Sequence, residues 1–249
     1  MRKPPNNVRN EAHADNVCAL LRLQPRLQRI AECVPRGARL ADIGTDHGYL
    51  PVWLLLGGVI DRAIASDINA APLGHARRTA EEYGVAERID FRLCAGLDAV
   101  APDEADIVVI AGMGGETIIE ILRTANWDWS GVTLLLQPMT KAELLRPWLV
   151  ENGFRIEEEH LVRDKGIIYA VLTVCAGHSE PLTPAEAWCG ASRDALYGDY
   201  AADRVRKLEE AAAGMRQAKT LDSNAIQRLE SDAAALRQRI KEWEDANGT

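Results

Sequence analysis

The sequence has few cysteines, and none of them forms a recognisable metal or disulfide motif. Its five cysteines are scattered over 249 residues, and no two form a Cys-x-x-Cys pair. Disulfide frameworks and structural zinc sites need regularly spaced cysteines, so neither is expected. The five histidines also lack the spacing of a ligand set, and we expect no metal. A reducing, cytoplasmic location is the expectation that follows.

Long hydrophobic runs are absent as well. The most apolar stretch, residues 50–60, is far shorter than the roughly 20 residues that a membrane-spanning helix needs. The first residues, Met-Arg-Lys-Pro-Pro-Asn-Asn, contain no apolar segment of the kind found in a secretory signal. We therefore expect no membrane association. With 47% hydrophobic residues, the chain can nevertheless form a globular core.

An excess of positive charge is missing too. The net charge of −8 argues against a general nucleic-acid-binding protein. The charge is unevenly distributed, because the first 40 residues carry eight Lys or Arg and only three Asp or Glu. Such a basic segment can hold a polyanion locally, but charge alone favours a solvated helix face. The sequence leaves both interpretations open.

Short apolar segments alternate with helical ones from about residue 39 to residue 175. Strands are predicted at 39–43, 63–67, 88–93, 106–110 and 132–136, and helices at 49–56, 72–83, 116–125 and 141–152. This alternation indicates an α/β fold in which helices cover both faces of a parallel sheet. Strands at 155–162 and 167–174 follow so closely that they form an antiparallel hairpin. Five parallel strands closed by such a hairpin resemble the seven-stranded, Rossmann-like sheet of class I methyltransferases.

Helices are predicted at both ends of this α/β region. A short amphipathic helix over about 25–34 precedes it, and a Gly- and Pro-containing linker at 177–184 follows it. Apolar residues spaced by three and four then form two stripes, which predict an antiparallel, coiled-coil-like helical hairpin with a turn near 220–223. We therefore divide the chain into 1–176, the N-terminal helix with the α/β domain, and 177–249, the linker with the helical hairpin. A monomer, or a weak homodimer through the hairpin, is expected.

The first predicted strand leads into a glycine-containing loop, Ala41-Asp-Ile-Gly-Thr-Asp-His-Gly-Tyr49. A glycine loop between the first strand and first helix of a parallel sheet is where nucleotide-like cofactors bind. Asp46 occupies the position at which a dinucleotide-binding loop needs a glycine beside the pyrophosphate, and its charge would repel that group. S-adenosylmethionine carries an ammonium and a sulfonium group, for which Asp42 and Asp46 are suitable neighbours. The loop therefore favours S-adenosylmethionine over NAD.

Three further strand ends carry candidate functional residues. Asp67 ends the second strand at the place where a carboxylate accepts hydrogen bonds from ribose hydroxyls, although it also suits a helix cap. The segment Val109–Gly115 contains three glycines among four residues, which indicates a close approach of backbone to another group. Gln137 ends the fifth strand, where a packing role and a substrate role are equally compatible with the sequence.

Taken in order, these motifs resemble one family. The runs Ala41–Pro51, Ser66–Asn69, Ile110–Gly115 and Leu136–Pro138 resemble those of the bacterial tRNA (adenine-22-N1)-methyltransferases, the TrmK family. The resemblance covers about residues 25–175 and extends to the C-terminal helical hairpin. It implies a class I methyltransferase fold, S-adenosylmethionine as methyl donor and N1 of an adenine in tRNA as acceptor.

The resemblance also implies roles for individual residues. It makes Asp46 and His47 the catalytic candidates, although His47 equally suits a helix cap. The implied donor-binding residues are Asp42, Gly44, Thr45, Gly48, Tyr49, Asp67, Ile68, Gly96, Ala111, Gly112, Met113 and Gly114. The implied tRNA-facing residues are Arg22, Arg26, Arg29, Gly115 and Gln137.

The chain departs from the family pattern at three places, one of which is the final hairpin, where the family's usual Lys and Glu are absent around residues 167–170. Ala95 stands where the family usually has an aspartate, so backbone groups or Asp98 must take over a contact with the donor's adenine. Met139 replaces an asparagine whose amide suits the target base. These changes keep two other interpretations open. One is a class I methyltransferase that acts on a small molecule or a protein, and the other is a non-catalytic, methyltransferase-like binding protein.

Overall fold

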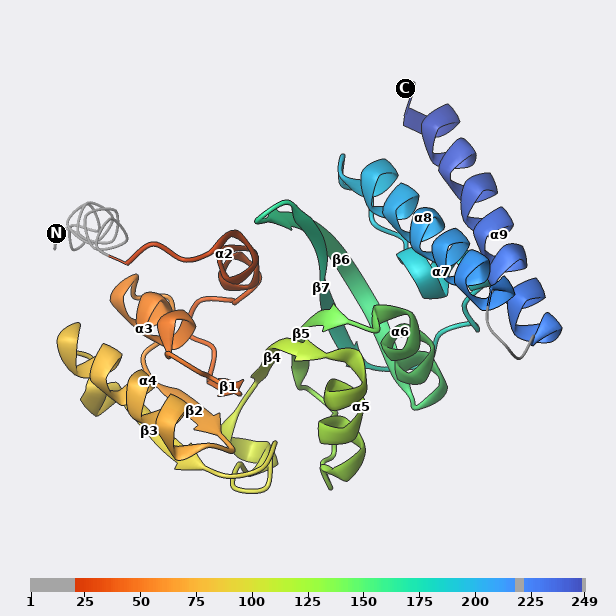
Figure 1. Ribbon diagram of the computed structural model, residues 1–249. Coiled ribbons are helices and arrows are strands. Elements are labelled where there is room, and N and C mark those ends of the chain that lie inside the picture. Colours follow the sequence, from red (N-terminus) through yellow and green to blue (C-terminus); the bar gives the residue numbers. More distant parts are fainter. Residues whose placement is uncertain (1–20, 218–221, 248–249) are drawn as a thin grey trace, which may run out of the picture.

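A single mixed sheet organises the chain. The computed structural model describes residues 21–217 and 222–247 (Figure 1). Within them the strands follow the order β3-β2-β1-β4-β5-β7-β6. The strands are β1 (Leu40–Ile43), β2 (Ala63–Asp67), β3 (Ile89–Leu93), β4 (Ile107–Gly114), β5 (Thr133–Thr140), β6 (Phe154–Asp164) and β7 (Ile167–Ala176). The first five pair in parallel and β7 pairs antiparallel with β5 and β6, so the predicted seven-stranded fold is confirmed.

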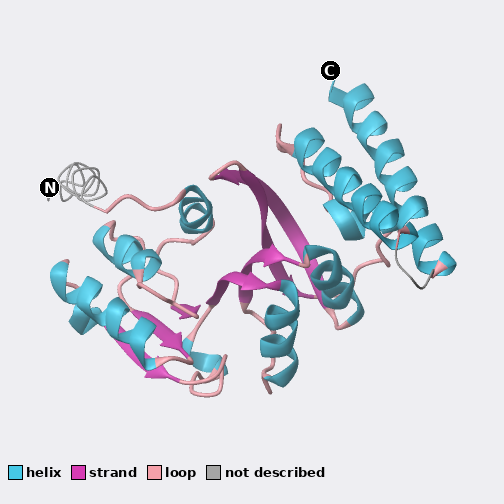
Figure 2. Cartoon of the chain, viewed as in Figure 1, coloured by secondary structure: helices cyan, strands magenta, loops and turns pink. Residues whose placement is uncertain are grey.

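Helices cover both faces of the sheet (Figure 2). One buried cluster packs α2 (Pro25–Glu32), α3 (Tyr49–Leu56) and α4 (Ala70–Glu82) against one face. A second packs α5 (Gly115–Thr124) and α6 (Ala142–Glu151) against the other. Two short 3₁₀ turns, η1 (Ala86–Arg88) and η2 (Pro102–Glu104), lie in the connections around β3. None of the described helices is both long and apolar enough to cross a membrane.

The structure differs from the expected element boundaries where strands approach turns. β4 continues to Gly114 and β5 to Thr140, each four residues beyond the predicted end. The extra pairing is irregular, with register shifts on both sides of Met113, which is typical of β-bulges. The β6–β7 turn is also tighter than predicted, because only Lys165 and Gly166 connect the strands, both with positive φ. Two such residues form the turn that matches the twist of a hairpin.

The C-terminal helices pack against the outer part of the sheet. They are α7 (Pro184–Cys189), α8 (Tyr197–Arg216) and α9 (Ser223–Asn247), and α8 and α9 lie side by side in Figure 1. A third buried cluster combines residues of all three helices with Leu161, Ile168 and Ala170 of the β6–β7 hairpin. The predicted helical hairpin is therefore confirmed, although residues 218–221 of its turn lie outside the described part. The division at residue 176 stays a prediction.

The short helix α7 begins where the predicted linker ends and is not among the predicted helices. Its N-terminus is a capping box, in which Thr183 and Glu186 each accept a hydrogen bond from the backbone N–H of the other. Proline occupies its first position. These are sequence signals of a helix start, but the helix has only six residues and no apolar periodicity to detect.

One buried ion pair joins the C-terminal helices to the sheet. Arg146 on α6 is fully buried and donates two hydrogen bonds to the Glu159 carboxylate on β6, at 3.1 and 2.5 Å. Its remaining N–H groups donate to the backbone oxygens of Ala187 and Trp188 and to the hydroxyl of Tyr200. Burial opposes the charge, but Glu159 and Tyr200 outweigh it and hold the pKa of Arg146 above its ordinary value. The pair therefore fixes α7 and α8 to α6 and β6.

We expect Glu159→Ala to destabilise the fold, because it leaves the Arg146 charge buried without its partner. The expected loss is about 3–5 kcal/mol of unfolding free energy, measured by chemical denaturation. Glu157→Ala is the matched control, because Glu157 lies on the same strand and pairs with Arg155 at the surface. That change is expected to cost about 1 kcal/mol or less. Equal losses in the two variants would contradict this role of the buried pair.

Candidate active site

A cavity opens at the carboxyl ends of the central strands. It has a volume of about 740 Å³ and is bordered by the ends of β1, β2 and β4 and by the loop after β3. The strand order reverses between β1 and β4, and this is where open α/β sheets bind ligands. The predicted site residues that line it are Arg26, Asp42, Gly44, Thr45, Asp46, His47, Tyr49, Asp67, Ile68, Gly96, Ala111, Gly112 and Met113.

The floor of the cavity carries a buried carboxylate. Asp42, at the end of β1, is only 6% exposed and accepts a hydrogen bond of 2.7 Å from the Thr45 hydroxyl. Burial raises the pKa of Asp42 to about 6, the Thr45 hydrogen bond opposes this shift, and the charge of Asp67 adds to it. The loop around Thr45 is fixed to β2, because the N–H groups of Gly44 and Thr45 both donate to the Ser66 carbonyl. Such a carboxylate favours a cationic ligand group.

Two glycines of the first loop have different functions. Gly44 lines the cavity with φ of +74°, and a Cβ atom there would overlap the side chain of Met113. Gly48 caps α3 with φ of +68°, and a Cβ atom there would press against Ala76 of α4. Gly48 is not among the residues that line the cavity. The structure thus gives it a packing function, whereas Gly44 keeps the cavity open.

The end of β2 presents two polar side chains to the cavity. One carboxylate oxygen of Asp67 accepts the backbone N–H of Asn69 at 2.8 Å, so this aspartate also shapes the turn into α4. Asn69, not Asp67, is the N-cap residue of α4. Beside it, the Ser66 hydroxyl is buried and has no hydrogen-bond partner among the described residues. A buried hydroxyl normally has a partner, so the cavity suits a ligand with a polar group at this point.

The catalytic candidates lie at the open end of the cavity. Asp46 has φ of +51°, which is strained for any residue but glycine, and its side chain is 70% exposed. His47 follows it, and its imidazole stacks on the rings of Tyr49 and His75 at centroid distances of 5.4 and 5.0 Å. The His47 Nε2 atom lies 3.9 Å from an Asp46 carboxylate oxygen. Both side chains therefore line the cavity and remain accessible to solvent.

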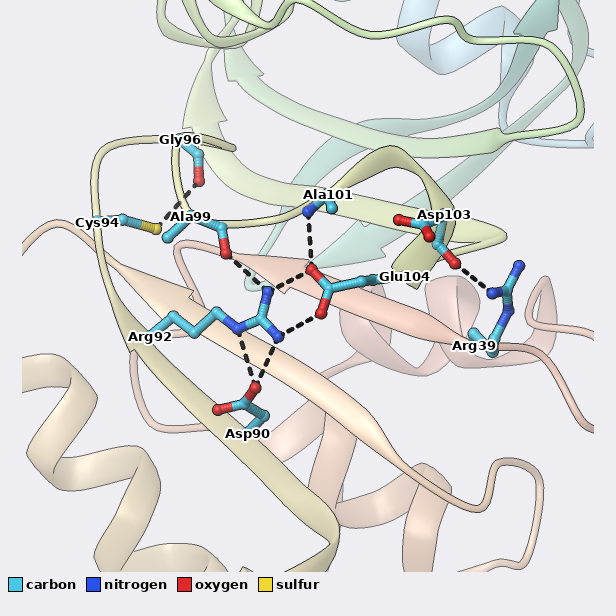
Figure 3. A network of polar contacts seen from close by, with 9 residues as sticks. All are labelled: Arg39, Asp90, Arg92, Cys94, Gly96, Ala99, Ala101, Asp103 and Glu104. Atoms are coloured by element: carbon cyan, nitrogen blue, oxygen red, sulfur yellow. Dashed lines mark hydrogen bonds and ion pairs between the residues drawn. The ribbon is translucent and has the colours of Figure 1, made fainter.

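A charged network shapes the loop that follows β3 (Figure 3). Arg92 donates to both carboxylate oxygens of Glu104, each at 2.7 Å, and to the carboxylate of Asp90. It also donates to the carbonyl oxygen of Ala99 at 2.7 Å. Arg92 and the N–H of Ala101 together lower the pKa of Glu104 to about 2. The network thus joins β3 to the middle and the far end of a loop whose residues 94–96 and 98 line the cavity.

Gln137 is packed rather than presented to the cavity. Its side chain is fully buried, and its carbonyl oxygen accepts hydrogen bonds from the Gly112 N–H and from Arg26, each at 3.2 Å. Its amide group donates to the carbonyl of Pro138 at 3.1 Å. Of the two roles that the sequence left open, these contacts support packing.

Other predicted site residues lie away from the cavity. Arg22 is exposed and borders a separate hollow formed with Glu82 of α4, and Arg29 pairs with Glu32 on its own helix at 3.0 Å. Gly115 is buried at the start of α5, where a Cβ atom would overlap the Lys141 carbonyl. Gly114 also lies outside the lining. These residues are not brought together with the catalytic candidates.

Several lining residues have no signal in the sequence motifs. They are Pro72, Thr117, Glu120, Ile121 and Thr124. Those from α5 occupy one helix face, and the apolar pattern that predicts this helix does not show that its exposed face borders a cavity. Ser66 also lines the cavity, and its position directly before Asp67, the predicted ribose ligand, is the sequence signal that points to it. Within residues 21–217 and 222–247, no cluster of three or more His, Cys, Asp or Glu side chains could hold a metal ion.

Comparison with known proteins identifies close relatives. The methyltransferase-domain family model matches residues 23–172. A tRNA (adenine(22)-N(1))-methyltransferase from Bacillus subtilis is 39% identical over 158 residues, which cover 63% of this chain and 66% of that protein. The chain therefore aligns with just under two thirds of this curated relative's length.

Solved structures align over a larger part of the chain. A candidate tRNA (m1A22) methyltransferase from Streptococcus pneumoniae is 31% identical, with a TM-score of 0.79, and the match covers 88% of this chain and 99% of that one. The same protein in complex with S-adenosyl-L-methionine matches with a TM-score of 0.76 and 31% identity, covering 86% of this chain and 98% of that one. The chain belongs to the methyltransferase-domain family and, within it, to the TrmK family of tRNA (m1A22) methyltransferases.

Proposed function

We propose that this protein transfers a methyl group from S-adenosylmethionine to N1 of an adenine in tRNA, at position 22 of the D-loop. The observation that carries the proposal is the cavity at the β1–β4 switch point, with Asp42 buried in its floor and Asp67 at its side. The relatives support the same assignment, because one of them binds S-adenosyl-L-methionine and another is a tRNA (adenine(22)-N(1))-methyltransferase.

The residues of the cavity fit this methyl donor. The buried Asp42 carboxylate, whose pKa is raised to about 6, is stabilised by an ammonium or sulfonium group nearby. Asp67 provides acceptor oxygens for ribose hydroxyls, and the Ser66 hydroxyl has a free donor and acceptor for a further polar group. Gly44 and Gly112, both with positive φ, let the backbone approach the donor closely.

Chemistry at this site requires alignment more than proton transfer. The donor supplies an electrophilic methyl group on a sulfonium, and adenine N1 carries an unprotonated in-plane lone pair near neutral pH. No strong general base is therefore needed, and the protein's task is to hold the reacting atoms about 3 Å apart and in line. Asp46 is positioned at the cavity mouth to stabilise the positive charge that adenine gains as N1 is methylated.

The acceptor atom sets a condition on the tRNA. Adenine N1 lies on the Watson–Crick edge, so the base must be unpaired or turned out of its stack to reach the cavity. The exposed Arg22 before α2 and the half-buried Arg29 within it suit contacts with the tRNA phosphates, because these are charge contacts without sequence information. We propose a cytoplasmic location for the enzyme, because the proposed substrate is tRNA. We propose that it acts as a monomer, because Ala233 and Leu236 of α9 are already buried within one chain.

The function is tested by identifying the methylated nucleoside. Purified protein is incubated with unmodified tRNA and isotopically labelled S-adenosylmethionine, and the digested tRNA is analysed by mass spectrometry. We expect labelled N1-methyladenosine. In the same assay Asp46→Asn is expected to lower the rate on the order of 10²-fold or more, because it removes the charge but keeps the shape. Asp46→Asn should leave donor affinity less affected than the rate.

Other outcomes of this assay would contradict the proposal. A different methylated nucleoside would retain the donor but change the acceptor atom. No incorporation into tRNA, with donor binding intact by calorimetry, would favour a small-molecule or protein acceptor, or a binding function. Full activity of Asp46→Asn would remove this residue from the mechanism.

We expect Arg92→Met to weaken donor binding, because the loop after β3 then loses the cation that joins Asp90, Ala99 and Glu104. The dissociation constant of S-adenosylmethionine, measured by calorimetry, is expected to rise by about tenfold, the equivalent of one to two lost hydrogen bonds.

Arg39→Met is the matched control for Arg92→Met. Arg39 belongs to the same region and pairs with Asp106. It also donates to the Asp103 carbonyl (Figure 3), and none of these hydrogen bonds reaches Asp90, Ala99 or Glu104, the partners of Arg92. Its replacement should leave donor affinity unchanged. An unchanged dissociation constant in Arg92→Met, with the fold intact by circular dichroism, would show that the loop keeps its shape without the network.

A further inference from the structure

Arg26, at the start of α2, contacts two segments that lie far from it in the sequence. Its Nη1 atom donates to the Gln137 side chain on β5 at 3.2 Å, and its Nε atom lies 3.4 Å from a carboxylate oxygen of Asp164, the last residue of β6. A third contact, from Nη2 to Gln24 at 3.1 Å, stays local. Arg26 also lines the donor cavity. It therefore joins the N-terminal helix, the β6–β7 hairpin tip and the end of β5 at one edge of the site.

The carboxylate of Asp164 explains why this arginine is held in place. Asp164 is only 6% exposed although it borders a tight turn, and a buried carboxylate is costly without a partner. Arg26 supplies that partner from α2, and Figure 1 shows α2 beside the hairpin tip. Since the ion pair is partly buried, it is weakened less by salt than an exposed one. The Arg26 guanidinium therefore already forms an ion pair within the protein, with Asp164 of the hairpin.

The contact with Gln137 continues to the backbone of the site. The same Gln137 oxygen accepts the N–H of Gly112, at 3.2 Å. Gly112 has φ of +75°, and a Cβ atom at this position would lie 3.3 Å from the Arg26 Nη1 atom. A side chain here would therefore crowd the guanidinium, and glycine adopts this backbone conformation without strain. Arg26, Gln137 and Gly112 therefore form one connected unit that shapes the Ala111–Met113 segment of the cavity wall.

We propose that Arg26 is a positioning residue for methyl transfer, which holds the Gly112 segment through Gln137, rather than a residue that binds tRNA phosphate. The proposal rests on the proposed function. The shape of the side chain supports it, because a planar guanidinium donates in three fixed directions and serves Gln24, Gln137 and Asp164 together. A lysine ammonium provides the charge for Asp164 but does not reach all three acceptors.

Two measurements distinguish positioning from phosphate binding. One is the maximal rate of tRNA methylation, and the other is the salt dependence of tRNA affinity, because each phosphate contact contributes about one unit to the slope of log K against log salt. For Arg26→Met we expect the rate to fall on the order of 10- to 100-fold and the salt slope to stay unchanged. Arg26→Lys should recover little of the rate. Gln137→Met should reproduce the loss, and the double variant should be no slower than either single variant.

Arg36→Met is the control for removing a positive charge near α2. Arg36 is exposed just beyond the helix, where it donates to the Gly58 carbonyl at 3.4 Å, and within the described part of the chain it forms no hydrogen bond or ion pair with a residue of the site. Its maximal rate should equal that of the unmodified protein. A readout independent of activity is the hydrogen-exchange rate of the Gly112 amide, which should rise in Arg26→Met and not in Arg36→Met, because the Gln137 acceptor is no longer held.

The opposite pattern would overturn the proposal. If Arg26→Met keeps its maximal rate and its salt slope falls by about one unit, Arg26 binds phosphate. Unchanged Gly112 exchange would likewise exclude the positioning role, including in a variant that has lost activity for another reason. Should Arg26→Met fail to fold, Arg26→Lys retains the charge beside Asp164 and carries the same measurements. Absence of methylation by the unmodified protein would instead count against the proposed function, and the Gly112 exchange would still test the positioning role.

Discussion

The carboxylate of Asp42 is buried at the end of β1 with a second carboxylate, Asp67, close enough to raise its pKa, and the rest of the site is arranged around this constraint. One hydrogen bond from Thr45 does not offset the burial, since the pKa of Asp42 remains near 6. In the protein alone, the stability contributed by the protonated form is present below about pH 4 and is lost as the pH rises through 6. At neutral pH the ionised, buried Asp42 lowers the stability of the protein alone, and a cationic ligand offsets this loss. The same charge disfavours a pyrophosphate, which separates this cavity from a dinucleotide site.

The polypeptide around that carboxylate is fixed by contacts that cross the sheet. The first loop is attached to β2 through two N–H groups on the Ser66 carbonyl, and the loop after β3 is attached through Arg92. On the opposite side of the cavity, the side-chain oxygen of Gln137 accepts hydrogen bonds from the Gly112 N–H and from Arg26. Each of these three segments of the cavity wall is thus held by polar contacts with another part of the protein, which we call its anchor. A reaction that depends on alignment benefits from such anchors, because small displacements of the reacting atoms cost large factors in rate.

Much of the fold follows from local sequence pattern, and much of the site does not. The five parallel strands and the glycine loop after β1 are predictable, because apolar segments and glycines act over a few residues. The anchors join residues far apart in sequence: Arg26 reaches Gln137, 111 positions away, and Arg146 reaches Tyr200, 54 positions away. From the sequence alone, Arg26 is therefore interpreted as a surface cation, and only the folded structure shows that it pairs with Asp164. The sequence likewise does not predict that β4 continues into its glycine-rich end, because this continuation is stabilised by pairing with β5, a tertiary contact.

The central claim is that a cation bound at the donor site compensates the negative charge of ionised Asp42. Proton release on donor binding tests this claim most directly. With a pKa of about 6, Asp42 is half protonated at pH 6, and a bound cation lowers that pKa and expels the proton. Calorimetry of S-adenosylmethionine binding at pH 6, in buffers of different ionisation enthalpy, counts the protons. A variant with His47 and His75 replaced by glutamine removes the nearby imidazoles from the count. The account predicts release of about half a proton per donor at pH 6 and almost none from Asp42 at pH 8. Binding without any proton release at pH 6 would contradict it.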